Sequence, residues 1–177
     1  MLPLLILFCF TRQIKEGVSL ASVMLLLSLL FAAADQLLKM LVVRDIKPIG
    51  TKVLIPGVLQ MDYTENTGAA FSMFEGGRWV FVAVTVVVCV LLIFAMFRYR
   101  NHEFFSWAAS ALIVGGGIGN LIDRVLHTYV VDYIHLLFFP AIFNFGDCCV
   151  VLGAVFFIIH ILFFSERDDV ERVIRTK

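Results

Sequence analysis

The sequence predicts an all-α polytopic membrane protein with four transmembrane helices, both termini in the cytoplasm, and a small extramembrane β-sheet between the first and second helices. Composition is the first indication, because 61% of the 177 residues are hydrophobic, 16% are charged, and the mean hydropathy is +0.97. A soluble domain is usually roughly 45–50% apolar and about 25% charged. Four apolar runs of near-spanning length, roughly 20 residues, are the second indication. The formal net charge of +0 offers no steering of nucleic acid, so we expect no nucleic-acid partner.

The four apolar runs divide the chain into the spans and connections of one membrane-embedded domain, residues 1–177. The first run ends in DQLLK, where Asp35 and Lys39 lie one helical turn apart on the same face. Such a pair either snorkels at the interface or turns inward to brace a polar site. The opening segment Met1–Phe10 is too short to span, and is either interfacial or the product of an upstream start site. The expected spans are residues 18–43, 79–97, 104–126 and 147–164, followed by a charged cytoplasmic tail at 165–177.

Residues 44–78 form the longest polar segment and are predicted to lie outside the membrane, on the outer face. Within this segment, VLIPGVLQMDY carries a turn signal at Pro56-Gly57. The β-branched residues on either side of the turn favour two short strands rather than a helix. We therefore expect a small extramembrane sheet here.

Lysine and arginine predict the orientation, because cytoplasmic loops carry an excess of both. Eight lie in the N-terminal segment, the 98–103 connection and the C-terminal tail, and five lie on the other side, spread over longer segments. Both termini are therefore predicted to be cytoplasmic. The connections 44–78 and 124–146 then share the outer face.

Polar side chains are concentrated in the mostly apolar stretch 115–147. Asp123 is followed directly by Arg124, which favours an ion pair or a helix-end cap. Asp132 and Asp147 have no adjacent cation, and two carboxylates in a partly dry site do not both ionise cheaply, so one keeps its proton. On the predicted topology, four carboxylates converge on one membrane surface: Asp35, Asp123, Asp132 and Asp147.

Three interpretations fit these residues taken alone. A carboxylate pair that shares one proton supplies an acid and a base, as in aspartic peptidases. Carboxylates in a membrane also serve as ion or proton relays in transporters, although a relay needs stations through the depth of the bilayer. The third interpretation is structural polar contact. A metal site is not predicted, because neither His127 nor His135 has a second histidine at metal-site spacing.

Five polar motifs follow one another between Asp35 and Asp147, across nearly the whole membrane body. The motifs are DQLLK (Asp35–Lys39), ENTGAAFS (Glu65–Ser72), GGGIGNLIDR (Gly115–Arg124), YVVDYI (Tyr129–Ile134) and FNFGD (Phe143–Asp147). The order of the motifs and the gaps between them are far more specific than any one motif. In this combination the chain resembles bacterial signal peptidase II, the family of prolipoprotein signal peptidases, which are intramembrane aspartic peptidases.

The resemblance implies that Asp132 and Asp147 form a catalytic dyad. It also implies a substrate, a lipid-modified prolipoprotein that is cut just before the diacylglyceryl-cysteine, with water as the nucleophile and no metal or organic cofactor. We expect a monomer in the bacterial inner membrane, surrounded by membrane lipid, with the active site near the periplasmic face. An ion- or proton-coupled transporter is the alternative function. The residues implied to support the site or the substrate are Asp35, Lys39, Asn66, Gly68, Asn120, Asp123, Arg124 and Asn144.

Roles for some supporting residues follow from their chemistry. Asn66 and Asn144 can donate amide hydrogen bonds to a substrate. Arg124 can pair with Asp123 or hold a substrate carbonyl. The pair in DQLLK can tie the first span to the outer loop.

The chain departs from the family pattern beside each dyad residue. The family more often has Phe where this chain has Tyr133, and it usually has Ala where this chain has Gly146. Tyr133 keeps the ring and adds a hydroxyl group. Gly146 loosens the backbone next to Asp147. Neither change removes a reacting group, and both bear on local positioning.

Overall fold

The computed structural model describes residues 2–68, 77–98 and 104–164, with side chains described from Leu20 onward. Along the described chain, one helix is followed by a pair of strands, two helices, a second pair of strands and a last helix. The elements are α1 (Leu2–Asp45), β1 (Thr51–Ile55), β2 (Leu59–Asn66), α2 (Arg78–Arg98), α3 (Phe104–His127), β3 (Val130–Leu136), β4 (Ile142–Phe143) and α4 (Phe145–Phe163).

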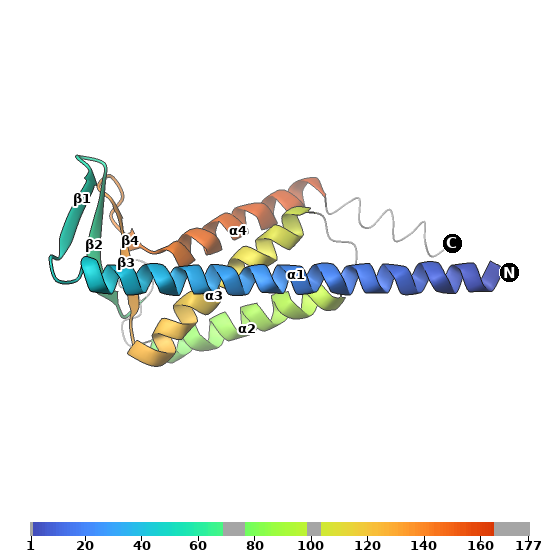
Figure 1. The fold of residues 1–177 in the computed structure, drawn as a ribbon. Helices are drawn as coiled ribbons and strands as arrows, with labels where there is room; N and C mark the ends of the chain where they lie inside the picture. The colour runs from blue at the N-terminus through green and yellow to red at the C-terminus, as the bar shows by residue number, and fades with distance from the viewer. Residues whose placement is uncertain (1, 69–76, 99–103, 165–177) are drawn as a thin grey trace.

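Within the described residues, four helices are long and apolar enough to cross a membrane, which confirms the predicted number. Residues 2–10 belong to α1, so they continue the first helix and do not form a separate element. Figure 1 shows α1 as one continuous helix whose early part extends away from the sheet. The predicted tail 165–177 lies outside the described residues. The spanning parts of the helices are Leu20–Asp45, Arg78–Arg98, Phe104–His127 and Phe145–Phe163.

Helix α3 is the central helix of the bundle. In its spanning part 56% of the residues are buried inside the protein, compared with 11% in α2 and 17% in α4. The outward faces of α2 and α4 are covered with apolar side chains such as Val87, Leu91 and Val151, all more than half exposed. Apolar surface of this kind suits contact with lipid. The polar residues carried by α3 are therefore held inside the bundle.

Three consecutive glycines let α3 approach three different helices. A Cβ at Gly115 would lie 2.6 Å from Cβ of Phe31 on α1, and one at Gly117 would lie 3.2 Å from Sγ of Cys89 on α2. A Cβ at Gly116 would overlap the carbonyl oxygen of Gly146 on α4. The glycines thus provide the close contact surfaces that small residues offer in membrane bundles, and α3 remains helical through them.

The sheet has four antiparallel strands in the order β1-β2-β3-β4. The predicted hairpin is present as β1 and β2, and Gly57 in its turn has a φ of 74°, which favours glycine. The sequence prediction was incomplete, because it placed the whole sheet between the first and second helices. Half of the strands, β3 and β4, come from the connection between α3 and α4. The fold is therefore not purely helical, and its sheet joins both connections.

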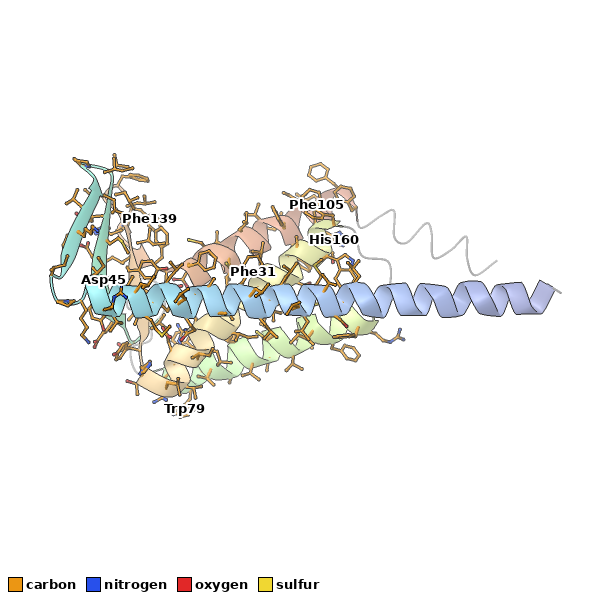
Figure 2. All side chains as sticks on the ribbon, viewed as in Figure 1. Phe31, Asp45, Trp79, Phe105, Phe139 and His160 are labelled. Atoms are coloured by element: carbon orange, nitrogen blue, oxygen red, sulfur yellow. The ribbon has the colours of Figure 1, made fainter. Side chains whose placement is uncertain are left out.

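The sheet lies at one end of the bundle, where α1 and α3 end and α2 and α4 begin (Figure 1). An apolar cluster holds it there: Val42 near the end of α1 and Ile46 just after α1 pack with Val131 and Tyr133 of β3, all buried. Figure 2 shows Trp79 and Asp45 at this end of the molecule and Phe105 and His160 toward the other end. The strand that carries Asp132 is thereby fixed against the helix ends.

Candidate active site

Asn144 lies at the centre of the site, as the cap of the first turn of α4. Its side-chain oxygen accepts a hydrogen bond from the backbone N–H of Asp147 at 2.9 Å, and the Asp147 carboxylate accepts one from the backbone N–H of Asn144 at 3.0 Å. This reciprocal arrangement is a capping box. The amide nitrogen of Asn144 is left free to donate to Asp132 at 2.6 Å. One buried asparagine therefore contacts both members of the predicted dyad.

Asp132 is held on β3 by two asparagines. Its second carboxylate oxygen accepts a hydrogen bond from Nδ2 of Asn66 at 2.8 Å. The β2–β3 register sets this contact, because Asn66 pairs with Val130 and Thr64 pairs with Asp132. Asp132 is only 2% exposed, so its carboxyl group is almost removed from water.

The pKa of Asp132 is raised to about 6, first by burial and then by the nearby charge of Asp147, and these causes outweigh the hydrogen bonds from Asn66 and Asn144, which lower it. A carboxyl group with this pKa holds or releases a proton near neutral pH. That is the property required of one member of an acid–base pair.

The Asp147 carboxylate accepts a second hydrogen bond, from α3. Nδ2 of Asn120 donates to Oδ1 of Asp147 at 2.8 Å. Asn120 is itself oriented by Lys39, whose ammonium group donates to Oδ1 of Asn120 at 2.8 Å. A chain of contacts therefore runs from the first span through α3 to the start of α4.

Lys39 is buried between two carboxylates. Its Nζ lies 2.7 Å from Oδ2 of Asp35 and 3.0 Å from Oδ2 of Asp123. The three residues are no more than 3% exposed. Of the two interpretations of DQLLK, the inward-turned pair is the one observed. The expectation that it ties the first span to the outer loop was wrong, because its partners lie on α3 and at the start of α4.

Asp35 also reaches the start of α4 directly. Its Oδ1 accepts a hydrogen bond from the backbone N–H of Gly146 at 2.8 Å. Gly119 permits this approach, because a Cβ there would overlap the Asp35 carboxylate. The position of the Asp35 carboxylate therefore depends on the absence of a side chain at Gly119.

Asp123 does not pair with Arg124, which corrects the sequence interpretation. Asp123 binds Lys39 and accepts hydrogen bonds from Nε2 of Gln36 at 2.8 Å and from the backbone N–H of Val131 at 3.1 Å. These contacts join α3 to α1 and to β3. A carboxylate and a cation that are adjacent in a helix point in different directions, because successive residues are about 100° apart around the axis.

Arg124 instead points toward Gly68 and α2. Its guanidinium donates to the carbonyl oxygen of Gly68 at 3.4 Å and lies over the ring of Phe81 at 5.2 Å. The backbone N–H of Gly68 donates to Oδ1 of Asn66 at 2.9 Å. Gly68 thus lies between Arg124 and an asparagine that holds Asp132. The rest of the ENTGAAFS motif, residues 69–72, lies outside the described residues.

All ten predicted site residues lie at the sheet end of the bundle and belong to one connected network of hydrogen bonds and ion pairs. Gly68 joins this network through Asn66, and Arg124 joins it through Gly68. Asn66 and Asn144 were expected to bind substrate, and the structure shows them bound to Asp132. Gln36 was missed, although it lies inside DQLLK: it bridges the carbonyl of Gly119 and Asp123. A polar residue between Asp35 and Lys39 was the available signal. Among the described residues, no three His, Cys, Asp or Glu side chains are grouped as metal ligands.

Fold and site together define a class: a polytopic membrane protein with a buried pair of carboxylates of the kind that aspartic peptidases use. The sequence model of the family described as signal peptidase (SPase) II matches residues 27–163. The chain belongs to the signal peptidase II family.

Named relatives and solved structures agree with this assignment. The lipoprotein signal peptidase of Caldanaerobacter subterraneus is 42% identical over 121 residues, covering 68% of this chain and 83% of the relative. That of Lactobacillus johnsonii is 38% identical over 147 residues, covering 81% and 94%. A bacterial membrane enzyme determined by the in meso method at 2.3 Å resolution has 29% identity and a TM-score of 0.72, covering 80% of this chain and 88% of its own. Nothing in these comparisons favours a transporter.

Proposed function

We propose that Asp132 and Asp147 are the catalytic dyad of an aspartic endopeptidase that removes the signal peptide from diacylglyceryl-modified prolipoproteins. The observation that carries the proposal is the position of Asn144, which hydrogen-bonds to the Asp132 carboxylate and caps Asp147 at the same time. Two buried carboxyl groups that bind the same asparagine share one proton, because ionising both in a dry site is costly. The pair then titrates as a unit.

The ionised carboxylate takes a proton from a water molecule, and the resulting hydroxide attacks the carbonyl carbon of the scissile bond. The protonated carboxyl group donates its proton to the carbonyl oxygen, so that the tetrahedral intermediate carries no net new charge. Collapse of the intermediate expels the amine of the lipidated cysteine, which leaves with a proton from the dyad. Three asparagines hold the two carboxylates in position while the protons are transferred: Asn66, Asn120 and Asn144.

Arg124 is the supporting residue with the most remaining donor capacity toward substrate. Its described hydrogen bond, to Gly68, is long at 3.4 Å, and a guanidinium carries five N–H groups. It is suited to hold a backbone carbonyl of the substrate beside the dyad.

The lipid part of the substrate suits the position of the site. The dyad lies where α4 begins, at the sheet end of helices whose outward faces are apolar. Acyl chains can remain in the bilayer while the peptide bond reaches the carboxylates. All these groups come from one chain, which supports action as a monomer.

The orientation belongs to the same proposal. Excess lysine and arginine in the terminal segments and the 98–103 connection favours cytoplasmic termini in a bacterial inner membrane. The sheet and dyad are then on the periplasmic side. The test is a Lys52→Cys variant in which the native cysteines are replaced, labelled with an impermeant maleimide in intact cells. Labelling is expected, and protection of this cysteine from the reagent contradicts the orientation.

The decisive experiment is cleavage of a diacylglyceryl-modified precursor by purified protein. We expect a single cut before the modified cysteine, and loss of at least about a thousandfold in rate for Asp132→Asn and for Asp147→Asn. Both variants should accumulate in the membrane at normal levels. Normal processing by either variant removes the dyad, and proton- or ion-coupled flux in liposomes without cleavage would favour a transporter.

A further inference from the structure

The first turn of α4 is held by side chains from outside α4. The first amide N–H groups of a helix have no partner within the helix. Here the N–H of Phe145 donates to the hydroxyl oxygen of Tyr133 at 3.3 Å, and that of Gly146 donates to Asp35 at 2.8 Å. The N–H groups of Asn144 and Asp147 are satisfied by their reciprocal cap. Four consecutive amides are therefore fixed, two of them by other elements.

Tyr133 is placed to fix its amide rigidly. It follows Asp132 on β3, is 4% exposed, and packs in the apolar cluster with Val42, Ile46 and Val131. A tyrosine has two side-chain torsions, and packing of the ring fixes both. The position of the hydroxyl group is thereby tied to the strand that carries Asp132.

Gly146 allows the first turn of α4 to approach α3 and the Asp35 carboxylate closely. A Cβ at this position would lie 3.0 Å from the carbonyl oxygen of Gly116 and 3.1 Å from carboxylate or amide oxygens of Asp35 and Asn144. Such contacts are tighter than most that real Cβ atoms make. The absence of a side chain therefore lets α3 and Asp35 approach the backbone immediately before Asp147.

We infer that Tyr133 is a positioning residue for the reaction, whose hydroxyl group fixes the first amide of α4 and thereby sets where Asp147 meets Asp132. The inference rests on the proposed function. Tyr133 and Asp132 are neighbours on one strand, and Phe145 and Asp147 lie within one helical turn. The Tyr133–Phe145 hydrogen bond thus joins the two rigid pieces that carry the dyad. A small displacement of a catalytic group is costly, since about 1 Å of misplacement can cost roughly a hundredfold in rate.

The test compares Tyr133→Phe with Tyr63→Phe. Both changes remove one phenolic hydroxyl and keep the ring, and both rings pack against the same apolar cluster. The exposed Tyr63 hydroxyl is bound to Lys47 and Glu65, neither of which belongs to α4. Tyr63→Phe is therefore a matched control for loss of a hydroxyl from the sheet.

For Tyr133→Phe we expect kcat for cleavage of a diacylglyceryl-modified precursor peptide to fall about three- to tenfold, as the loss of one neutral hydrogen bond allows. KM should stay within about twofold, because substrate binding is not altered. Amide hydrogen exchange at Phe145 and Gly146 should become faster while the middle of α4 is unchanged. Tyr63→Phe should leave kcat and these exchange rates unchanged.

An unchanged kcat in Tyr133→Phe overturns the inference, as does an equal fall in Tyr63→Phe or a rise in KM with kcat preserved. Unchanged exchange at Phe145 in a Tyr133→Phe protein shows that the hydrogen bond does not fix this amide, and overturns the inference independently of activity. Failure of the unaltered protein to cleave the precursor overturns the proposed function and the positioning role with it. Normal cleavage by Tyr133→Phe overturns the positioning role alone.

Discussion

The ammonium group of Lys39 donates a hydrogen bond to Oδ1 of Asn120 at 2.8 Å. An ammonium group only donates, so this contact settles which end of the Asn120 amide faces which partner. The amide NH₂ must point the other way, and it donates to the Asp147 carboxylate at 2.8 Å. The ammonium group of Lys39 in the first span therefore orients the Asn120 amide so that it donates to Asp147.

Replacing Lys39 with Met should strongly destabilise the protein, because it leaves Asp35 and Asp123 buried without their cation. Removing one partner from a buried ion pair costs about 3–5 kcal/mol. We expect a large fall in the thermal unfolding midpoint in detergent and low abundance in the membrane. The matched control is Lys47→Met, which removes an exposed cation from Glu65 and should leave the midpoint nearly unchanged. Similar midpoints for the two variants would contradict a structural role for the buried lysine.

Variants of Asn144 should separate the cap from the contact with Asp132. Asn144→Ser keeps a cap oxygen for the Asp147 N–H but removes the donor to Asp132, so we expect near-normal stability and a rate at least about tenfold lower. Asn144→Ala removes both functions and should also lose about 1 kcal/mol of unfolding free energy. Thermal unfolding and precursor cleavage measure the two effects. Equal cleavage rates for Asn144→Ser and the unaltered protein would show that the Asp132 contact is dispensable.

The pH dependence of stability should report the pKa of Asp132, which rises from 3.8 to about 6 on folding. Because the folded state binds the proton more tightly, this group favours folding most below pH 4, and its contribution is lost as pH rises through about 6. The change amounts to at most about 3 kcal/mol. An amide does not titrate, so Asp132→Asn should lack this decline. Unfolding midpoints measured between pH 4 and pH 7 test the prediction, and parallel curves for the two proteins would contradict it.

Asp62 provides a control of opposite sign. Burial opposes its ionisation, but hydrogen bonds from Gln60, Thr51 and His135 outweigh burial and lower its pKa. Its contribution to stability is therefore present above the unfolded pKa and is lost as pH falls through the folded value. Asp62→Asn should remove stability near neutral pH and make the protein less sensitive to acid, in contrast to Asp132→Asn.

Gly119→Ala should disrupt the brace at the start of α4. Alanine normally favours a helix over glycine by about 1 kcal/mol, but a Cβ here would overlap the Asp35 carboxylate. We expect lower stability and slower cleavage, because Asp35 would lose its place beside Lys39 and the Gly146 amide. Gly117→Ala, two residues earlier, meets only the side chains of Cys89 and Thr85 at 3.2 and 3.3 Å and should be milder. An equally stable Gly119→Ala protein would show that the site tolerates movement of Asp35.

By itself the sequence determined the four membrane helices and the first hairpin, and it predicted which polar residues meet at one end of the bundle. Hydrophobic runs of spanning length have few alternatives in a membrane, and Pro56-Gly57 marked the turn between β1 and β2. Ionisable residues are so costly among apolar ones that Asp123, Asp132 and Asp147 stood out, whereas supporting residues such as Asn66 and Gly68 were predicted from the family resemblance. The strand β3 was missed because its first four residues are all buried, so the polar–apolar alternation of a surface strand is weak there. The strand β4 has only two residues, which are too few to show a period.

Only the tertiary structure decided which polar groups pair. Asp123 has a cation as its sequence neighbour, yet it binds Lys39, 84 positions away along the chain, because helix geometry turns Arg124 toward α2. Asn66 and Asn144 bind Asp132 because the strand register and the helix cap bring three distant segments together. Sequence spacing fixes which face of a helix or strand a side chain occupies, whereas the partner across that face depends on how the elements pack.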